Sequence, residues 1–277
     1  MKKLILSSLV CFSLAQADVT TIKPYSAYIT YDTNPANSIK DKGILGGVYY
    51  SKGNLGYLLE VDASYTKIGY KSSTISDIKQ SDLTILYNKY YAKYMLKGGF
   101  HYLNTSDTIL GNGVVLIAGV GVYKWKYYDK LSAGVDLYYT KYTSTNIVQL
   151  SPYFQYSKAI NISTRNNIDI KVNYIYSDSY TQKSYKSIEI SDTLFYKRFT
   201  LTTKAYFGEM KSAVLDGGFT MFNTQDLLKS GYSIKLGYVA KKNLSFELGY
   251  SINNFVEDGL TNDTRNSVAL LSATYRF

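Results

Sequence analysis

Cysteine, histidine and proline are scarce in this chain. Its 277 residues include one cysteine, Cys11, one histidine, His101, and three prolines. No cysteine follows position 11, so disulfides and thiolate metal sites are excluded from the rest of the chain. Three prolines provide no proline-rich linker, and the composition does not shift along the chain. One domain is therefore the simplest organisation.

Long apolar runs are also absent, because no stretch approaches the roughly 18 residues of a membrane-spanning helix. The N-terminus has a different pattern: Met-Lys-Lys, an apolar segment over 4–14, then Ala15-Gln16-Ala17. It predicts a secretory signal peptide over 1–17 and a single domain over 18–277. A lipoprotein anchor at Cys11 is the alternative. The residue before it, Val10, is not the small residue that such sites usually have.

Tyrosine is the abundant residue, with 31 copies, and the net charge is +10. Tyr, Ile, Val and Thr favour strands, and Tyr is also favoured at membrane interfaces. The mean hydropathy of −0.16 suits a β-barrel with one wet face and one apolar face. We expect no nucleic-acid partner for an exported chain.

Side chains alternate with period two along most of the chain, which places them on opposite faces of strands. In the last segment, Leu271, Tyr275 and Phe277 oppose Ser272 and Arg276. Segments of about 10–13 residues are long for a soluble β-sandwich and suit tilted membrane strands. We expect fourteen strands, with twelve as the alternative, near 24–31, 43–51, 55–67, 80–91, 93–105, 112–124, 130–142, 147–157, 166–177, 186–196, 198–210, 230–240, 243–255 and 266–277.

Short and long links alternate between these segments, with 211–229 the longest. This pattern predicts short periplasmic turns, longer outer loops and both termini on the periplasmic side of an all-β, antiparallel, up-and-down transmembrane barrel. The short links are basic, and at that end we expect them to attract anionic lipid headgroups. Their basic residues are Lys52, Lys124, Lys126, Lys130, Lys158, Lys197, Arg198, Lys241 and Lys242.

The C-terminus resembles that of bacterial outer-membrane β-barrel proteins, which end in an aromatic residue preceded by apolar residues at alternating positions. Here these are Phe277, Tyr275, Ala273, Leu271 and Ala269. Length and expected strand number resemble those of the monomeric fourteen-stranded porins. The resemblance implies an outer-membrane location and recognition by the barrel-assembly machinery.

The expected lumen carries charges of both signs on a wall with many small residues. A barrel of fourteen strands lies between those filled by their own side chains and those with a wide channel. Small wall residues such as Gly134, Gly249 and Ser251 favour open space, whereas segment 211–229 either folds inward or forms an ordinary surface loop. The candidate pore-lining residues are Glu60, Asp62, Asp82, Lys93, Lys97, His101, Asp136, Asp169, Lys171, Glu189, Lys204, Lys235, Glu247 and Arg276.

These features predict a channel for passive diffusion of small hydrophilic solutes or ions. The near-balanced charges predict weak ion selectivity, and each charge can alternatively be a paired wall residue. The other functional class is a surface barrel whose outer loops bind a partner. A transporter of apolar solutes is a third hypothesis, disfavoured by the polar lumen. We expect no enzymatic activity, because no motif places a partner beside His101. We also expect no cofactor or metal, because the sequence shows no cluster of ligands.

Overall fold

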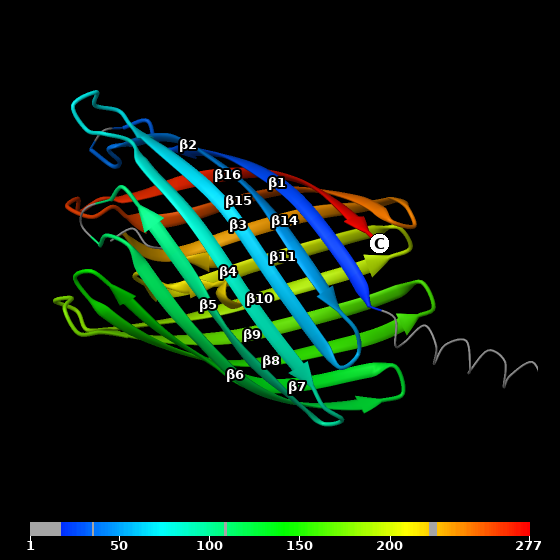
Figure 1. Ribbon diagram of the computed structural model, residues 1–277. Coiled ribbons are helices and arrows are strands. Elements are labelled where there is room, and N and C mark those ends of the chain that lie inside the picture. Colours follow the sequence, from blue (N-terminus) through cyan, green and yellow to red (C-terminus); the bar gives the residue numbers. More distant parts are fainter. Residues whose placement is uncertain (1–17, 35, 108–109, 222–225) are drawn as a thin grey trace, which may run out of the picture.

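The computed structural model describes residues 18–34, 36–107, 110–221 and 226–277. Fourteen antiparallel strands form a closed barrel (Figure 1), as the sequence predicts. The strands are β1 (Val19–Tyr31), β2 (Lys40–Gly53), β3 (Tyr57–Tyr70), β4 (Ile78–Tyr90), β5 (Tyr94–Thr105), β6 (Gly113–Lys126), β7 (Asp129–Tyr142), β8 (Asn146–Asn161), β9 (Thr164–Ser177), β10 (Ser184–Tyr196), β11 (Phe199–Met210), β14 (Leu227–Lys241), β15 (Leu244–Val256) and β16 (Asp263–Arg276).

Each strand pairs with its neighbours in sequence, and β1 closes the ring by pairing with β16. The strands extend beyond several of the expected limits, most of all at β1, which begins at Val19 rather than at 24. There Thr20 pairs with Lys52 of β2, and its carbonyl accepts a hydrogen bond from the amide of Phe277. Closure thus supplies partners that the local sequence pattern does not reveal.

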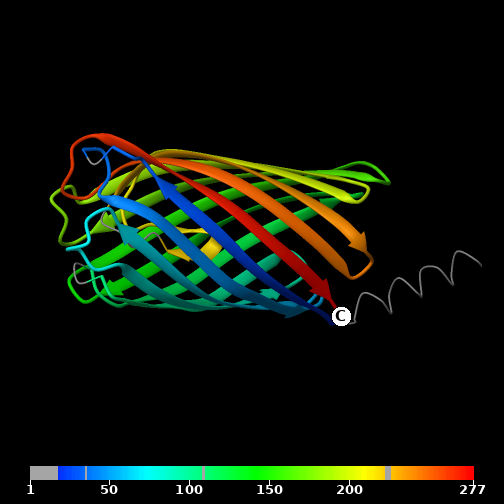
Figure 2. The same cartoon turned by 90° about the horizontal axis from the view of Figure 1, so that it is seen from above.

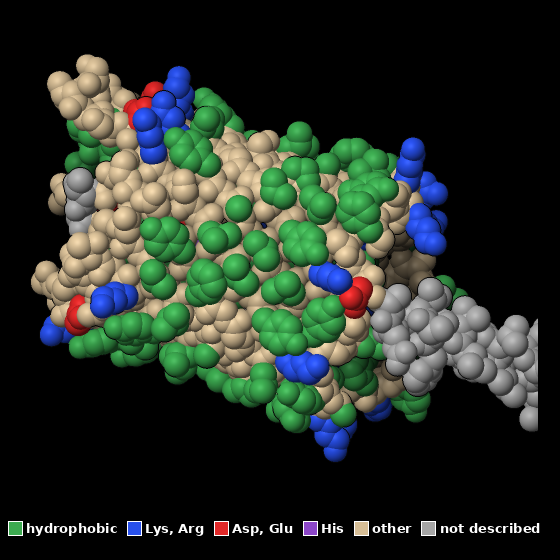
Figure 3. All heavy atoms as spheres, in the orientation of Figure 1, with side chains coloured by type: hydrophobic (Ala, Val, Ile, Leu, Met, Phe, Trp, Pro, Cys, Tyr) green, Lys and Arg blue, Asp and Glu red, His purple; other side chains and the backbone are tan. Residues whose placement is uncertain are grey.

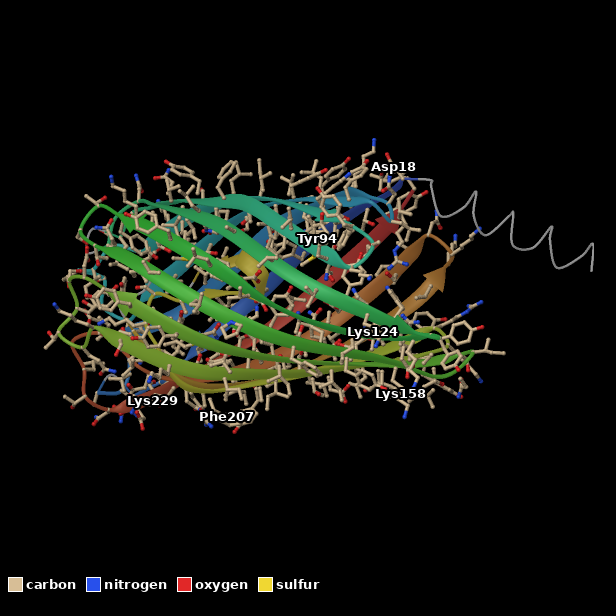
Figure 4. The ribbon with its side chains drawn as sticks, turned by 90° about the horizontal axis from the view of Figure 1, so that it is seen from below. Asp18, Tyr94, Lys124, Lys158, Phe207 and Lys229 are labelled. Atoms are coloured by element: carbon tan, nitrogen blue, oxygen red, sulfur yellow. The ribbon has the colours of Figure 1, made fainter. Side chains whose placement is uncertain are left out.

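The connections differ between the two ends of the barrel. Six turns of two or three residues lie at the end that also holds the C-terminus and the start of β1 (Figure 1), whereas the opposite end carries loops of up to sixteen residues. Figure 4 labels Lys124 and Lys158 toward the short-turn end and Lys229 toward the loop end. The predicted alternation of links is present except at 143–145, a link at the loop end that is as short as the turns, and the basic residues of the short links lie at the short-turn end.

The outer face of the barrel is apolar. Leu116, Leu236, Leu248 and Leu271 are each more than half exposed, and Figure 3 shows apolar side chains across one side of the barrel, with charged groups mainly toward its ends. Exposed aromatic residues lie near both rims, among them Tyr94 and Phe199 at the short-turn end and Tyr102, Tyr174 and Phe207 nearer the loops. A closed barrel with an apolar band and aromatic girdles is a transmembrane barrel.

Two strands, β6 and β10, do not alternate regularly between polar and apolar residues in the sequence, and the structure shows which of their side chains face inward. In β6, Val115 and Ile117 point inward, whereas Leu116 and Val120 point outward. Asp192 of β10 does lie on the outer face, where its carboxylate accepts a hydrogen bond of 2.5 Å from Asn166 Nδ2. Among the described residues, no helix has both the length and the apolar character needed to cross a bilayer.

The buried apolar core lies inside the barrel, in the half toward the long loops. It is formed by inward side chains from several strands and from the loop between β11 and β14. Its members include Leu103, Val115, Tyr138, Ile147, Ile175, Met210, Val214, Met221, Leu228 and Phe255. The lumen is therefore packed with side chains toward the loops.

Candidate functional site: the barrel lumen

Segment 212–221, part of the loop between β11 and β14, folds into the barrel. It contains β12 (Val214–Leu215), the short helix η1 (Asp216–Gly218) and β13 (Thr220–Met221). Figure 2 shows this yellow segment within the outline of the barrel. The sequence allowed an inward fold or a surface loop for 211–229, and the structure has the inward fold. Phe222, which belongs to that expected segment, lies outside the described residues.

The inward segment is attached to both sides of the barrel. The buried side-chain amide of Gln149 in β8 pairs with the backbone of Val214, donating at 2.8 Å and accepting at 2.9 Å. Across the lumen, the Phe219 ring packs edge-on against Tyr49 of β2, with centroids 5.7 Å apart. Segment 212–221 therefore crosses the lumen and divides it.

A tight turn at Asp216, Gly217 and Gly218 lets the segment cross and return. Their φ angles are 50°, 73° and 119°, all in the left-handed region that glycine adopts without steric cost. A Cβ on Gly218 would lie 2.6 Å from Cδ1 of Ile117, so the backbone approaches the wall closely there. The Asp-Gly-Gly sequence supplies both the turn and the close approach.

A cavity of about 760 Å³ lies between this segment and the short-turn end. Leu215, Asp216 and Phe219 of the segment face it on one side, and Tyr90 and Lys130, near the short turns, line its other end. Eight of the candidate pore-lining residues border this cavity, namely Glu60, Lys97, Asp136, Asp169, Lys171, Glu189, Lys204 and Lys235.

The other six candidates lie elsewhere. Glu247 pairs with Lys23 on the inner wall, with 3.0 Å between the ammonium nitrogen and carboxylate oxygen. Lys93 and Arg276 are exposed at the short-turn rim. Arg276 belongs to a strand, whereas Lys93 lies in a turn. The remaining three, Asp62, Asp82 and His101, lie on the inner wall but do not border the cavity.

Every carboxylate of the cavity has a hydrogen-bond donor. Asp136 pairs with Lys97 at 2.8 Å, and Glu189 and Asp216 both pair with Lys204, at 2.6 and 3.0 Å. Glu60 accepts from Tyr49 and Asn88, and Asp169 accepts from Gln155. In contrast, the ammonium groups of Lys171 and Lys235 form no hydrogen bond or ion pair within the described part of the chain. The cavity thus offers free cations but no free carboxylate.

No family model matches the sequence, and no curated protein matches it. Solved structures do resemble the barrel. A FadL homologue of Pseudomonas aeruginosa gives a TM-score of 0.53 at 12% identity over 94% of this chain and 90% of that one. Omp33 of Acinetobacter baumannii gives 0.51 at 12% over 93% and 97%, and the monoaromatic hydrocarbon channel CymD gives 0.53 at 8% over 93% and 88%.

The chain has the fold of bacterial outer-membrane β-barrel proteins. With its apolar outer face, that fold indicates the outer-membrane location expected from the sequence. Identities of 8–12% show the fold and leave the solute open.

The single histidine of this outer-membrane barrel has two partners that the sequence did not reveal. His101 Nδ1 lies 2.7 Å from Thr84 Oγ1, and its Nε2 lies 3.0 Å from Asp82 Oδ1. The strand register sets Thr84 directly opposite His101. A hydroxyl, an imidazole and a carboxylate in line can activate a nucleophile. However, Thr84 and His101 are 1% exposed and do not border the cavity, so a substrate has no access to them.

Several small wall residues lie beneath tyrosines of neighbouring strands. Gly121 and Gly134 both lie under the Tyr153 ring, because a Cβ on either would come within 2.6 Å of Tyr153 atoms. Gly231 lies in the same way under Tyr206. The expectation that small inward residues leave open space therefore fails at Gly134. The tyrosine rings occupy the space that the glycines leave on the wall, so the cavity is narrower than the glycines alone suggest.

A second, outer pocket of about 570 Å³ lies among the long loops. Its lining includes Tyr180, Tyr185 and Lys211, with the Lys211 ammonium 4.7 Å from the Tyr180 ring centre. Burial raises the pKa of Tyr180 to about 12, so its hydroxyl stays protonated and contacts Ser212 at 2.7 Å. Among the described residues, no group of three His, Cys, Asp or Glu side chains is placed to hold a metal.

Proposed function

We propose that this protein is an outer-membrane channel for the passive diffusion of small hydrophilic solutes or ions, closed toward the loops by segment 212–221. The observation that carries this proposal is the charged cavity of about 760 Å³, which lies between that segment and the short-turn end. A polar lumen inside a closed barrel provides solutes with a hydrated path across the hydrocarbon layer. On this proposal the protein has no enzymatic activity.

The solute path has three parts. The outer pocket receives the solute, segment 212–221 forms the barrier, and the inner cavity leads to the periplasm. On this proposal the apolar outer band and aromatic girdles contact outer-membrane lipids, and the basic short turns lie near anionic headgroups of the inner leaflet. The terminal Phe277 and alternating apolar residues of β16 are the proposed recognition signal for the barrel-assembly machinery.

The test is conductance of the refolded protein in a planar bilayer. The wild type is compared with a variant in which 213–220 is replaced by a short Gly-Ser linker. We expect rare or brief openings from the wild type and steady conductance from the variant. A variant with the exposed loop 71–77 shortened is the control and should conduct like the wild type. If both proteins show the heat-sensitive gel mobility of folded barrels yet neither conducts, the channel proposal is wrong.

The second candidate is a surface barrel whose outer loops bind a partner. The outer pocket, with two tyrosines and a lysine beside polar side chains, favours it. Absence of conductance from the folded linker variant would favour this candidate, because its function requires no path through the lumen.

A further inference from the structure

The tip of segment 212–221 presents a carboxylate to the cavity. Asp216 Oδ1 lies 3.0 Å from the Lys204 ammonium, and Asp216 Oδ2 accepts a 2.9 Å hydrogen bond from Thr220. Its side chain is 53% exposed, so the carboxylate faces the open space of the lumen. The other four cavity carboxylates belong to barrel strands, whereas Asp216 belongs to the loop that folds into the lumen.

Lys204 is held in position independently of Asp216. Its ammonium also contacts Glu189 Oε2 at 2.6 Å, and that carboxylate, only 6% exposed, accepts a further bond of 2.7 Å from Asn173. Removal of Asp216 therefore leaves the Lys204 ammonium fixed and directed at the cavity. Lys171 and Lys235, which have no acceptor, border the same cavity.

The charge count of the cavity depends on where Asp216 lies. Lys97, Lys130, Lys171, Lys204 and Lys235 oppose five carboxylates, namely Glu60, Asp136, Asp169, Glu189 and Asp216. With the segment in place these charges cancel. If Asp216 leaves with the segment, one positive charge is in excess beside Lys204. The cavity then carries one excess positive charge, whereas its charges balance while Asp216 is in place.

Building on the proposed channel function, we infer that the solutes are small organic carboxylates, and that Asp216 occupies their binding site on Lys204 when the channel is closed. A solute carboxylate replaces that of Asp216 on Lys204, with Lys171 and Lys235 as additional cations. The carbon part of the solute contacts Leu228 and Leu270 of the barrel wall, which border the same cavity. No covalent step is involved, because one carboxylate exchanges for another.

This exchange couples solute binding to opening. A ligand shifts a conformational equilibrium only when it binds one state better than the other. Here the closed state presents the site already filled by Asp216, and the open state presents it free. A carboxylate solute therefore favours the open state, whereas a neutral solute of the same shape has no such preference.

The test uses benzoate as the carboxylate, benzyl alcohol as its neutral counterpart, and the refolded protein in a planar bilayer. We expect millimolar benzoate to raise the open probability several-fold and benzyl alcohol to leave it unchanged. D216N should open several-fold more often than the wild type without benzoate and respond weakly to it. D263N, which alters an exposed ion pair with Lys229 outside the lumen, is the matched control and should behave as the wild type.

Lysine variants test the site itself. K204M leaves Glu189 buried without its cation, so it can fail to fold. K235M breaks no ion pair and keeps the inference testable. We expect K235M to respond several-fold less to benzoate. The inference is wrong if the linker variant conducts while benzoate opens the wild type no better than benzyl alcohol. Absence of conductance from the folded linker variant would instead contradict the channel function itself.

Discussion

The two halves of the lumen are built from the same strands, yet they have opposite character. Toward the loops, inward positions carry apolar residues such as Leu103, Ile147 and Ile175, each at most 1% exposed. Toward the short turns, inward positions of the same sheet carry Asp169 and Lys171, which border open space. Position along a strand therefore decides whether an inward side chain belongs to the barrier or to the passage.

The comparison also explains why the inward segment lies where it does. Its apolar residues, including Val214 and Met221, join the packed half, whereas Asp216 faces the hydrated half. An apolar segment is stable inside a barrel only where other apolar side chains cover it. The barrier is thus a small hydrophobic core, and experiments that weaken this core should act differently from experiments in the cavity.

The largest expected effect is on stability, from a buried ion pair in the packed half. Lys40 pairs with Asp226 at the end of the inward loop, and both side chains are 5% exposed. K40M leaves the Asp226 charge buried and unpaired, which should lower the free energy of unfolding by about 3–5 kcal/mol. K23M, which breaks the less buried pair with Glu247, should cost about 1 kcal/mol or less. Urea unfolding of both variants in detergent gives the comparison, and equal losses would show that burial does not separate the two pairs.

A smaller loss of stability, but a large rise in open probability, is expected when the contact between the Gln149 amide and the Val214 backbone is removed. Q149L removes both hydrogen bonds to Val214 and leaves its buried backbone groups unpaired, which should cost about 1–3 kcal/mol of stability. Because the loss falls on the closed arrangement, we expect a higher open probability in bilayer recordings. Q155L, whose parent amide binds Asp169 in the cavity instead, is the matched control. Similar open probabilities for the two variants would indicate that the segment is not held by Gln149.

The strands could be predicted from the sequence because alternation and link length are local signals. All fourteen expected strands are present, with limits shifted by a few residues. The contacts that define the site are not local. Gln149 and Val214 are 65 residues apart, and Lys40 and Asp226 are 186 apart. Their proximity depends on barrel closure and on the path of one loop, which no periodicity encodes. The Asp-Gly-Gly turn was the available signal, since it permits a tight reversal at the segment tip.

The smallest expected effect is the change in open probability under moderate acid. The two halves differ here in their titratable groups, and Asp216 of the inward segment faces the cavity half. Asp216 belongs to a loop rather than to a spanning strand, and Lys204 lowers its pKa below the ordinary 3.8. A lowered pKa means that the carboxylate stabilises the closed arrangement above pH 3.8 and loses this contribution only as the pH falls through the lower, folded-state pKa. Open probability recorded at constant salt should therefore stay unchanged from pH 7 to pH 5. A gate controlled by an ordinary histidine would change over that interval. Opening between pH 7 and pH 5 would thus assign the barrier to a group other than Asp216, and the same titration of D216N would show whether that group acts in its absence.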